Sequence, residues 1–162
     1  MTRGPLNLEV AVRYGLPRRG IPSATSFRNW VAAALDGRIR QADIGIRIVD
    51  AREGRALNRH YRGKDYATNV LSFPGELDPD IRLPKGVTLP LMGDVVLCAP
   101  VVAREAAEQR KPTSAHYAHL TVHGALHLLG WDHDDPADAE AMEQLEREVL
   151  AGLGIADPYL VR

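Results

Sequence analysis

The sequence predicts one α+β domain, in which a mixed sheet of about four strands packs with about five helices. Short apolar runs of strand character alternate along the chain with longer segments of helical periodicity. Its 162 residues suit one domain with a substantial core, and 45% hydrophobic with 25% charged residues is typical of globular proteins. We therefore expect residues 1–162 to form a single domain with no internal repeat.

The strands are predicted from alternation and from β-branched residues. Residues 6–12 alternate apolar side chains with polar or small ones, and residues 43–49 are rich in isoleucine and valine. Residues 70–73 form a short third run that Pro74 is expected to stop, and residues 91–98 resume as a fourth. The four prolines within residues 74–90 predict a long loop between the last two strands.

The helices are predicted from apolar stripes and capping residues. Ser23, Asp50 and Asp135 stand where N-caps are expected, and Gly37 follows the first helix. In the last helix the apolar residues are expected to face inward and the acidic residues outward. The predicted helices cover residues 24–36, 51–61, 101–109, 115–129 and 137–150.

Several features indicate a cytoplasmic protein. No apolar run approaches the roughly 20 residues of a membrane span. The first 13 residues lack the apolar region of a signal peptide. The single cysteine, Cys98, excludes an internal disulfide and is expected to be a buried apolar residue.

Charge is distributed unevenly along the chain. Residues 1–70 carry 13 Lys and Arg against 6 Asp and Glu, whereas residues 71–162 carry 7 against 15. All but Lys64 of the first group are arginines, whose planar guanidinium suits phosphate. The imbalance predicts either a nucleic-acid-binding surface or two halves that neutralise each other in the fold.

Histidines dominate one predicted helix. Five of the six in the chain are His116, His119, His123, His127 and His133, and the first four lie within about 80° of arc on one helical face. Buried imidazoles need partners for two ring nitrogens, so four on one stripe favour a binding site over an ordinary core.

The turn after this helix selects the ligands. Gly130 can adopt the left-handed conformation that ends a helix, which allows His133 to fold back toward His127 and His123. His119 lies about 12 Å along the axis from His127, too far to share one metal. The predicted ligands are therefore His123, His127 and His133, at the C-terminal end of a buried helix.

Three imidazoles with a fourth position left for water are typical of catalytic zinc, and we expect one Zn²⁺ per chain. Nickel or another divalent ion is the alternative. The spacing resembles the H-E-x-x-H-x-x-G-x-x-H motif of metzincin proteases, but Gly124 stands at the position of the glutamate base. Peptide hydrolysis is therefore disfavoured.

Two longer motifs resemble those of the YbeY family, bacterial rRNA maturation factors and metal-dependent endoribonucleases. Residues 123–133, His-Gly-Ala-Leu-His-Leu-Leu-Gly-Trp-Asp-His, carry the first, and the second runs from Leu57-Asn58 to Pro74. Gly93-Asp94 and residues 115–119 add shorter matches, and the likeness extends over most of the chain from about Asp43.

The resemblance implies zinc held by His123, His127 and His133, and an arginine needed for activity at Arg62. It also implies action on ribosomal RNA, at small-subunit 16S precursor ends, and in ribosome quality control. The implied partners are the ribosome or its small subunit and ribosome-associated proteins.

Some roles stay open at this level. Arg62 is predicted either to clamp a phosphodiester or to pair with Asp65 or Glu53 on the surface. Asp94 is either structural or orients a histidine. The general base is Asp132, His116 or His119, and the 2′-hydroxyl of the RNA is an alternative nucleophile to water. Two alternative functions are a ribosome-assembly factor with a structural zinc and a zinc hydrolase of another substrate.

Overall fold

The computed structural model describes residues 5–75, 83–86, 89–132 and 134–160. Its strands are β1 (Asn7–Tyr14), β2 (Gln41–Val49), β3 (Val70–Pro74) and β4 (Leu91–Cys98). Its helices are α1 (Ala24–Leu35), α2 (Ala51–Arg62), α3 (Ala99–Glu108), α4 (Thr113–Leu128) and α5 (Pro136–Gly152). The predicted α+β class and the predicted elements are confirmed.

The sheet is mixed, with strand order β1-β2-β4-β3. β1 and β4 both run parallel to β2, whereas β3 pairs antiparallel with β4 at the edge. Pro74 was expected to stop the third strand, but it is the last residue of β3 and lies opposite Gly93. A proline is tolerated there because an edge strand has only one neighbour to bond.

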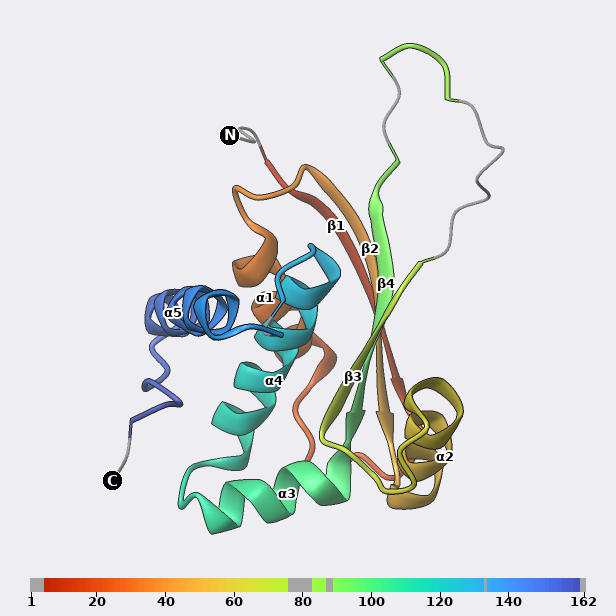
Figure 1. Cartoon of the computed structure of the whole chain (residues 1–162), viewed down its shortest axis with the longest axis vertical. Helices are drawn as coiled ribbons and strands as arrows, with labels where there is room; N and C mark the ends of the chain where they lie inside the picture. Colours follow the sequence, from red (N-terminus) through yellow and green to blue (C-terminus); the bar gives the residue numbers. More distant parts are fainter. Residues whose placement is uncertain (1–4, 76–82, 87–88, 133, 161–162) are drawn as a thin grey trace.

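Helices cover both faces of the sheet unequally. In Figure 1, α1, α4 and α5 lie on one side and α2 lies on the other. Alternate residues of β4 face opposite sides of the sheet. Val95 and Leu97 join the larger core with α1 and α4, and Val96 and Cys98 join a smaller cluster with Leu57 of α2. The central helix α4 contacts the sheet as well as α1, α3 and α5.

The predicted helix caps are confirmed. The side chains of Ser23, Asp50 and Asp135 accept hydrogen bonds from the backbone N–H groups of the third residues after them. Gly37, with φ 73°, follows the end of α1. These ends are local features, so each could be predicted from a few neighbouring residues.

Most of the predicted loop between β3 and β4, including residues 76–82 and 87–88, lies outside the described residues. Among the residues that are described, none of the helices has the length and apolar character needed to cross a membrane.

Candidate metal centre and active site

Helix α4 carries four of the histidines, in different environments. His116 is 3% exposed, and its Nε2 lies 2.9 Å from Glu105 Oε1, which also accepts a bond from Asn69. Burial lowers the pKa of His116, although the Glu105 carboxylate opposes this effect. His116 is thus tied into the junction of α3, α4 and β3, and its buried ring disfavours a role as general base.

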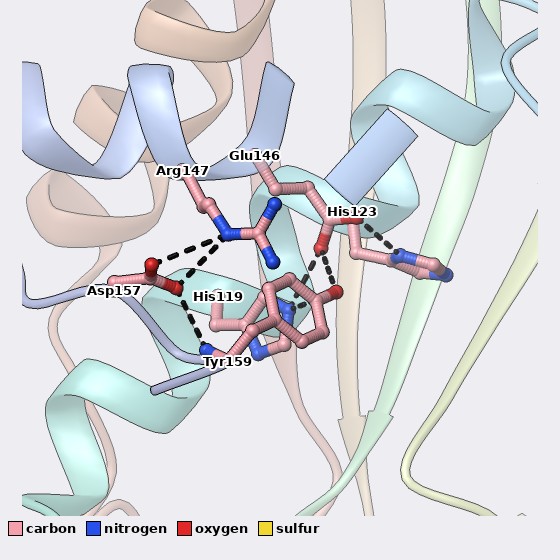
Figure 2. A network of polar contacts seen from close by, with 6 residues as sticks. All are labelled: His119, His123, Glu146, Arg147, Asp157 and Tyr159. Carbon is pink, nitrogen blue, oxygen red and sulfur yellow. Dashed lines mark hydrogen bonds and ion pairs between the residues drawn. The ribbon is translucent and has the colours of Figure 1, made fainter. Parts of the chain in front are cut away.

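The two middle histidines of the stripe contact a buried carboxylate that the sequence did not reveal (Figure 2). Glu146 of α5 is 0% exposed, and its Oε1 lies 2.7 Å from His119 Nε2. Its second oxygen, Oε2, lies 3.3 Å from His123 Nδ1. The expectation that the acidic residues of this helix face outward is therefore wrong for Glu146.

Two histidines compensate the burial of Glu146. Burial raises the pKa of the Glu146 carboxyl, but hydrogen bonds and charge from His119 and His123 outweigh it and lower the pKa to about 2. Glu146 is therefore an ionised hydrogen-bond acceptor at neutral pH. An acceptor at Nδ1 holds the imidazole of His123 with Nε2 as its outer nitrogen, and Figure 2 shows that nitrogen directed away from Glu146.

The C-terminal segment completes this network. The Tyr159 hydroxyl lies 2.9 Å from Glu146 Oε1 and 3.1 Å from His119 Nε2. Burial and the Glu146 carboxylate raise the pKa of Tyr159, so its hydroxyl stays protonated and donates. Arg147 pairs with Asp157 at 3.2 Å and lies over the Tyr159 ring, which fixes the segment against α5.

Removing the Tyr159 hydroxyl tests whether its hydrogen bond to Glu146 stabilises the fold. Tyr159→Phe is expected to lower the free energy of unfolding by about 1–2 kcal/mol, because a buried hydrogen bond to a charged group is lost. Thermal or urea unfolding measures the change. Tyr66→Phe is the matched control, since Tyr66 is 53% exposed. Equal stability of the two variants would contradict a structural role for the Tyr159 hydroxyl.

Helix α4 ends at a left-handed Gly130, as the sequence predicted. Gly130 has φ 106°, and its N–H donates to His127 O, while Trp131 N–H donates to Leu126 O. These two bonds form a Schellman motif, which ends α4 just after His127. The chain therefore turns back at the end of the histidine stripe.

The ligand set itself stays a prediction. His123 and His127 lie one turn apart on α4, and both are half-buried. The third predicted ligand, His133, lies outside the described residues. Among the residues that are described, no three His, Cys, Asp or Glu side chains are grouped so as to hold a metal. The residues that are present fit zinc, because the Glu146 carboxylate accepts from His123 Nδ1 and so orients His123 Nε2 away from Glu146. A carboxylate in this position is common behind imidazoles that bind zinc.

The structure also explains Gly124. This position faces the sheet, and a Cβ there would come within 2.7 Å of Val95 Cγ1. The carbonyl oxygen of Gly124 accepts a bond of 3.1 Å from Ser72 Oγ on β3. A glutamate at residue 124 would point into the core, so this helix packs too closely on the sheet for the metzincin arrangement.

Arg62 lies apart from the histidines. It is the exposed last residue of α2, a helix that lies on the opposite side of the sheet from α4 (Figure 1). Its predicted surface pairings are wrong, because Asp65 pairs with Arg55 and Glu53 pairs with Arg47. The guanidinium of Arg62 makes no hydrogen bond or ion pair with the described residues, so it is open to a ligand.

Asp94 does not orient a histidine of α4. Its neighbour Val95 packs toward α4, so Asp94 points to the opposite face of the sheet, where its carboxylate lies against Gly45. There it lines a cavity of about 660 Å³ together with Arg13 and Arg47. Of the two roles considered for Asp94, the structure therefore favours the structural one.

The fold and this site define an α+β protein with a row of imidazoles on its central helix and a buried carboxylate behind them. A family model described as endoribonuclease YbeY matches residues 20–154. Curated proteins named endoribonuclease YbeY from Stenotrophomonas maltophilia and Xanthomonas oryzae are each 72% identical over 159 residues, which is 98% of both chains. This chain therefore belongs to the endoribonuclease YbeY family.

A solved structure supports the fold. The solution structure of a Thermotoga maritima protein aligns with a TM-score of 0.57, covering 94% of this chain and all of that one. At 21% sequence identity this likeness shows a shared fold and no more.

Proposed function

We propose that this chain is a single-strand-type, zinc-dependent endoribonuclease that acts in rRNA maturation, at the 3′ end of small-subunit 16S rRNA. Its membership of a family of endoribonucleases supports RNA as the substrate. The ribosome or its small subunit, together with ribosome-associated proteins, are the proposed partners, and quality control of ribosomes in the cytoplasm is the proposed setting.

The observation that carries this proposal is the hydrogen bond between the buried Glu146 carboxylate and His123 Nδ1. A buried carboxylate that accepts from one ring nitrogen is the usual support of a metal-binding imidazole, because it sets the orientation of the ring and raises the basicity of the other nitrogen. His123 and His127, with His133, would hold one Zn²⁺.

Each side chain then has a defined task. Bound zinc would polarise a phosphoryl oxygen or lower the pKa of water. Glu146 orients His123, and Tyr159 and His119 hold Glu146. The Arg62 guanidinium would bind a phosphate of the RNA strand.

Cleavage of a 16S precursor fragment by purified, zinc-loaded protein tests the proposal. His123→Ala and Arg62→Glu are each expected to lower the rate by about 100-fold or more. Arg104→Glu is the control, since Arg104 is an exposed arginine of α3 that pairs with Glu108. Unchanged activity in both active-site variants would indicate a contaminating nuclease instead.

Metal analysis is an independent test of the ligands. We expect about one zinc per purified chain and a clear deficit in His127→Ala and His133→Ala. Full zinc content in either variant would remove that residue from the ligand set. Full zinc content in the wild type without RNA cleavage would favour the assembly-factor alternative.

A further inference from the structure

The outer face of α2 carries a row of arginines. Arg52, Arg55, Arg59 and Arg62 follow one another at intervals of three or four residues, and all four are exposed. They lie within about 80° of arc and extend over about 15 Å of helix. One flank of the helix, with Gly54 and Asn58, is buried against the fold.

Most of this positive charge is not neutralised. Arg55 forms a bidentate pair with Asp65, at 2.7 and 2.9 Å. The guanidinium groups of Arg52, Arg59 and Arg62 form no hydrogen bond or ion pair with any described residue, although Arg59 lies near enough to Asp65 to help lower the pKa of its carboxyl. The acidic residue of the first turn, Glu53, is engaged by Arg47 of β2.

The row does not serve the stability of the helix. Like charges three or four residues apart destabilise a helix by about 0.2–0.5 kcal/mol per pair. An exposed face that could hold neutral residues instead holds four arginines, which indicates a polyanionic ligand. The planar guanidinium of arginine matches phosphate oxygens. Tyr66, which follows the Arg55 partner Asp65 in the chain, has an exposed ring that can stack on a base.

The fold connects this face to the histidine helix. Tyr61 packs on Phe73 of β3 with ring centroids 4.6 Å apart. The preceding residue, Ser72, donates a hydrogen bond to Gly124 O of α4 from the other face of the strand. β3 is an edge strand, so these two contacts place the end of α2 and helix α4 on opposite faces of the sheet at the same edge. A strand of RNA lying along α2 would reach α4 by passing this edge at Arg62.

We infer that Arg52, Arg55 and Arg59 form an RNA-docking surface, which holds successive phosphates of the substrate away from the bond that is cut. This inference rests on the proposed ribonuclease function. It adds a binding site on the opposite side of the sheet from the metal centre. From Arg52 to Arg59 the surface extends over about 10 Å of helix, which accommodates roughly three phosphates at about 3.4 Å per nucleotide of a stacked strand.

Binding of a labelled single-stranded RNA by Arg52→Gln/Arg59→Gln tests the inference; Arg55 is left in place to keep its pair with Asp65. Each lost phosphate contact lowers the slope of log K against log salt by about 0.7. We therefore expect the slope to fall by about 1.4 and the affinity at 0.15 M salt to fall about tenfold. KM for a long RNA should rise by a similar factor with little change in kcat.

Arg40→Gln/Arg104→Gln is the control, because it removes two exposed charges outside α2. Equal RNA affinity and salt slope in the two double variants, with wild-type cleavage intact, would overturn the docking surface and leave the proposed function standing. Failure of the wild type to bind or cleave RNA would instead reject the proposed function. Competition by polyglutamate as strong as by RNA of equal charge would show that the surface selects acidic protein and overturn the inference.

Discussion

Replacing Glu146 with alanine is expected to lower the free energy of unfolding by about 3–5 kcal/mol, because one partner of a buried, hydrogen-bonded charge network is removed. His119, His123 and the Tyr159 hydroxyl all lose their shared acceptor. Zinc affinity is expected to fall about 10- to 100-fold, as when the carboxylate behind a metal-bound histidine is lost. Urea unfolding of the metal-free protein and chelator competition measure the two effects separately.

Glu140→Ala provides the control for Glu146. Glu140 is an exposed glutamate of the same helix, so its removal should change stability by less than about 0.5 kcal/mol and leave zinc affinity unchanged. Glu146→Gln keeps the side-chain size and separates packing from charge. If Glu146→Ala matched Glu140→Ala in both measurements, Glu146 would have no role in the fold or the site.

The same carboxylate predicts an acid dependence of the metal-free protein. The pKa of Glu146 is about 2 when folded and about 4.3 in an unfolded chain, so its stabilising effect is present above about pH 4.3 and is lost as the pH falls toward 2. The difference corresponds to roughly 3 kcal/mol. This part of the acid dependence should be absent in Glu146→Gln.

Introducing the missing protease residue, as Gly124→Glu, is expected to prevent stable folding and to confer no peptidase activity. Even the Cβ would come within 2.7 Å of Val95 Cγ1 and 3.2 Å of Ser72 Oγ. Overpacking alone costs about 1–3 kcal/mol, and burial of an unpaired carboxylate adds several more. Expression level, circular dichroism and thermal unfolding measure the result.

Two further variants separate sterics from charge. Gly124→Ala adds only the Cβ and should destabilise by about 1–3 kcal/mol. Gly152→Ala is the control, because a Cβ there meets no atom within 4 Å. It lies in α5, where alanine is favoured over glycine, so it should be neutral or slightly stabilising. A folded, stable Gly124→Glu protein would show that α4 does not pack on β4 as described.

The sequence by itself determined the features that depend on neighbouring residues. The caps at Ser23, Asp50 and Asp135, the β-branched strands and the turn at Gly130 all rest on short-range chemistry, and the structure confirms them. The histidine stripe was equally visible, because helical periodicity alone places those residues on one face.

Only the tertiary structure decided where the polar partners lie. Helical periodicity predicted that Glu146 faces solvent. The pattern of apolar residues cannot show that His119 and His123, 27 and 23 positions earlier in the chain, lie next to it. The steric reason for Gly124 depends on the distance between α4 and β4. The place of Arg62 depends on which face of the sheet α2 covers. Each of these depends on long-range packing, which brings together groups whose spacing along the chain says nothing about their distance in space.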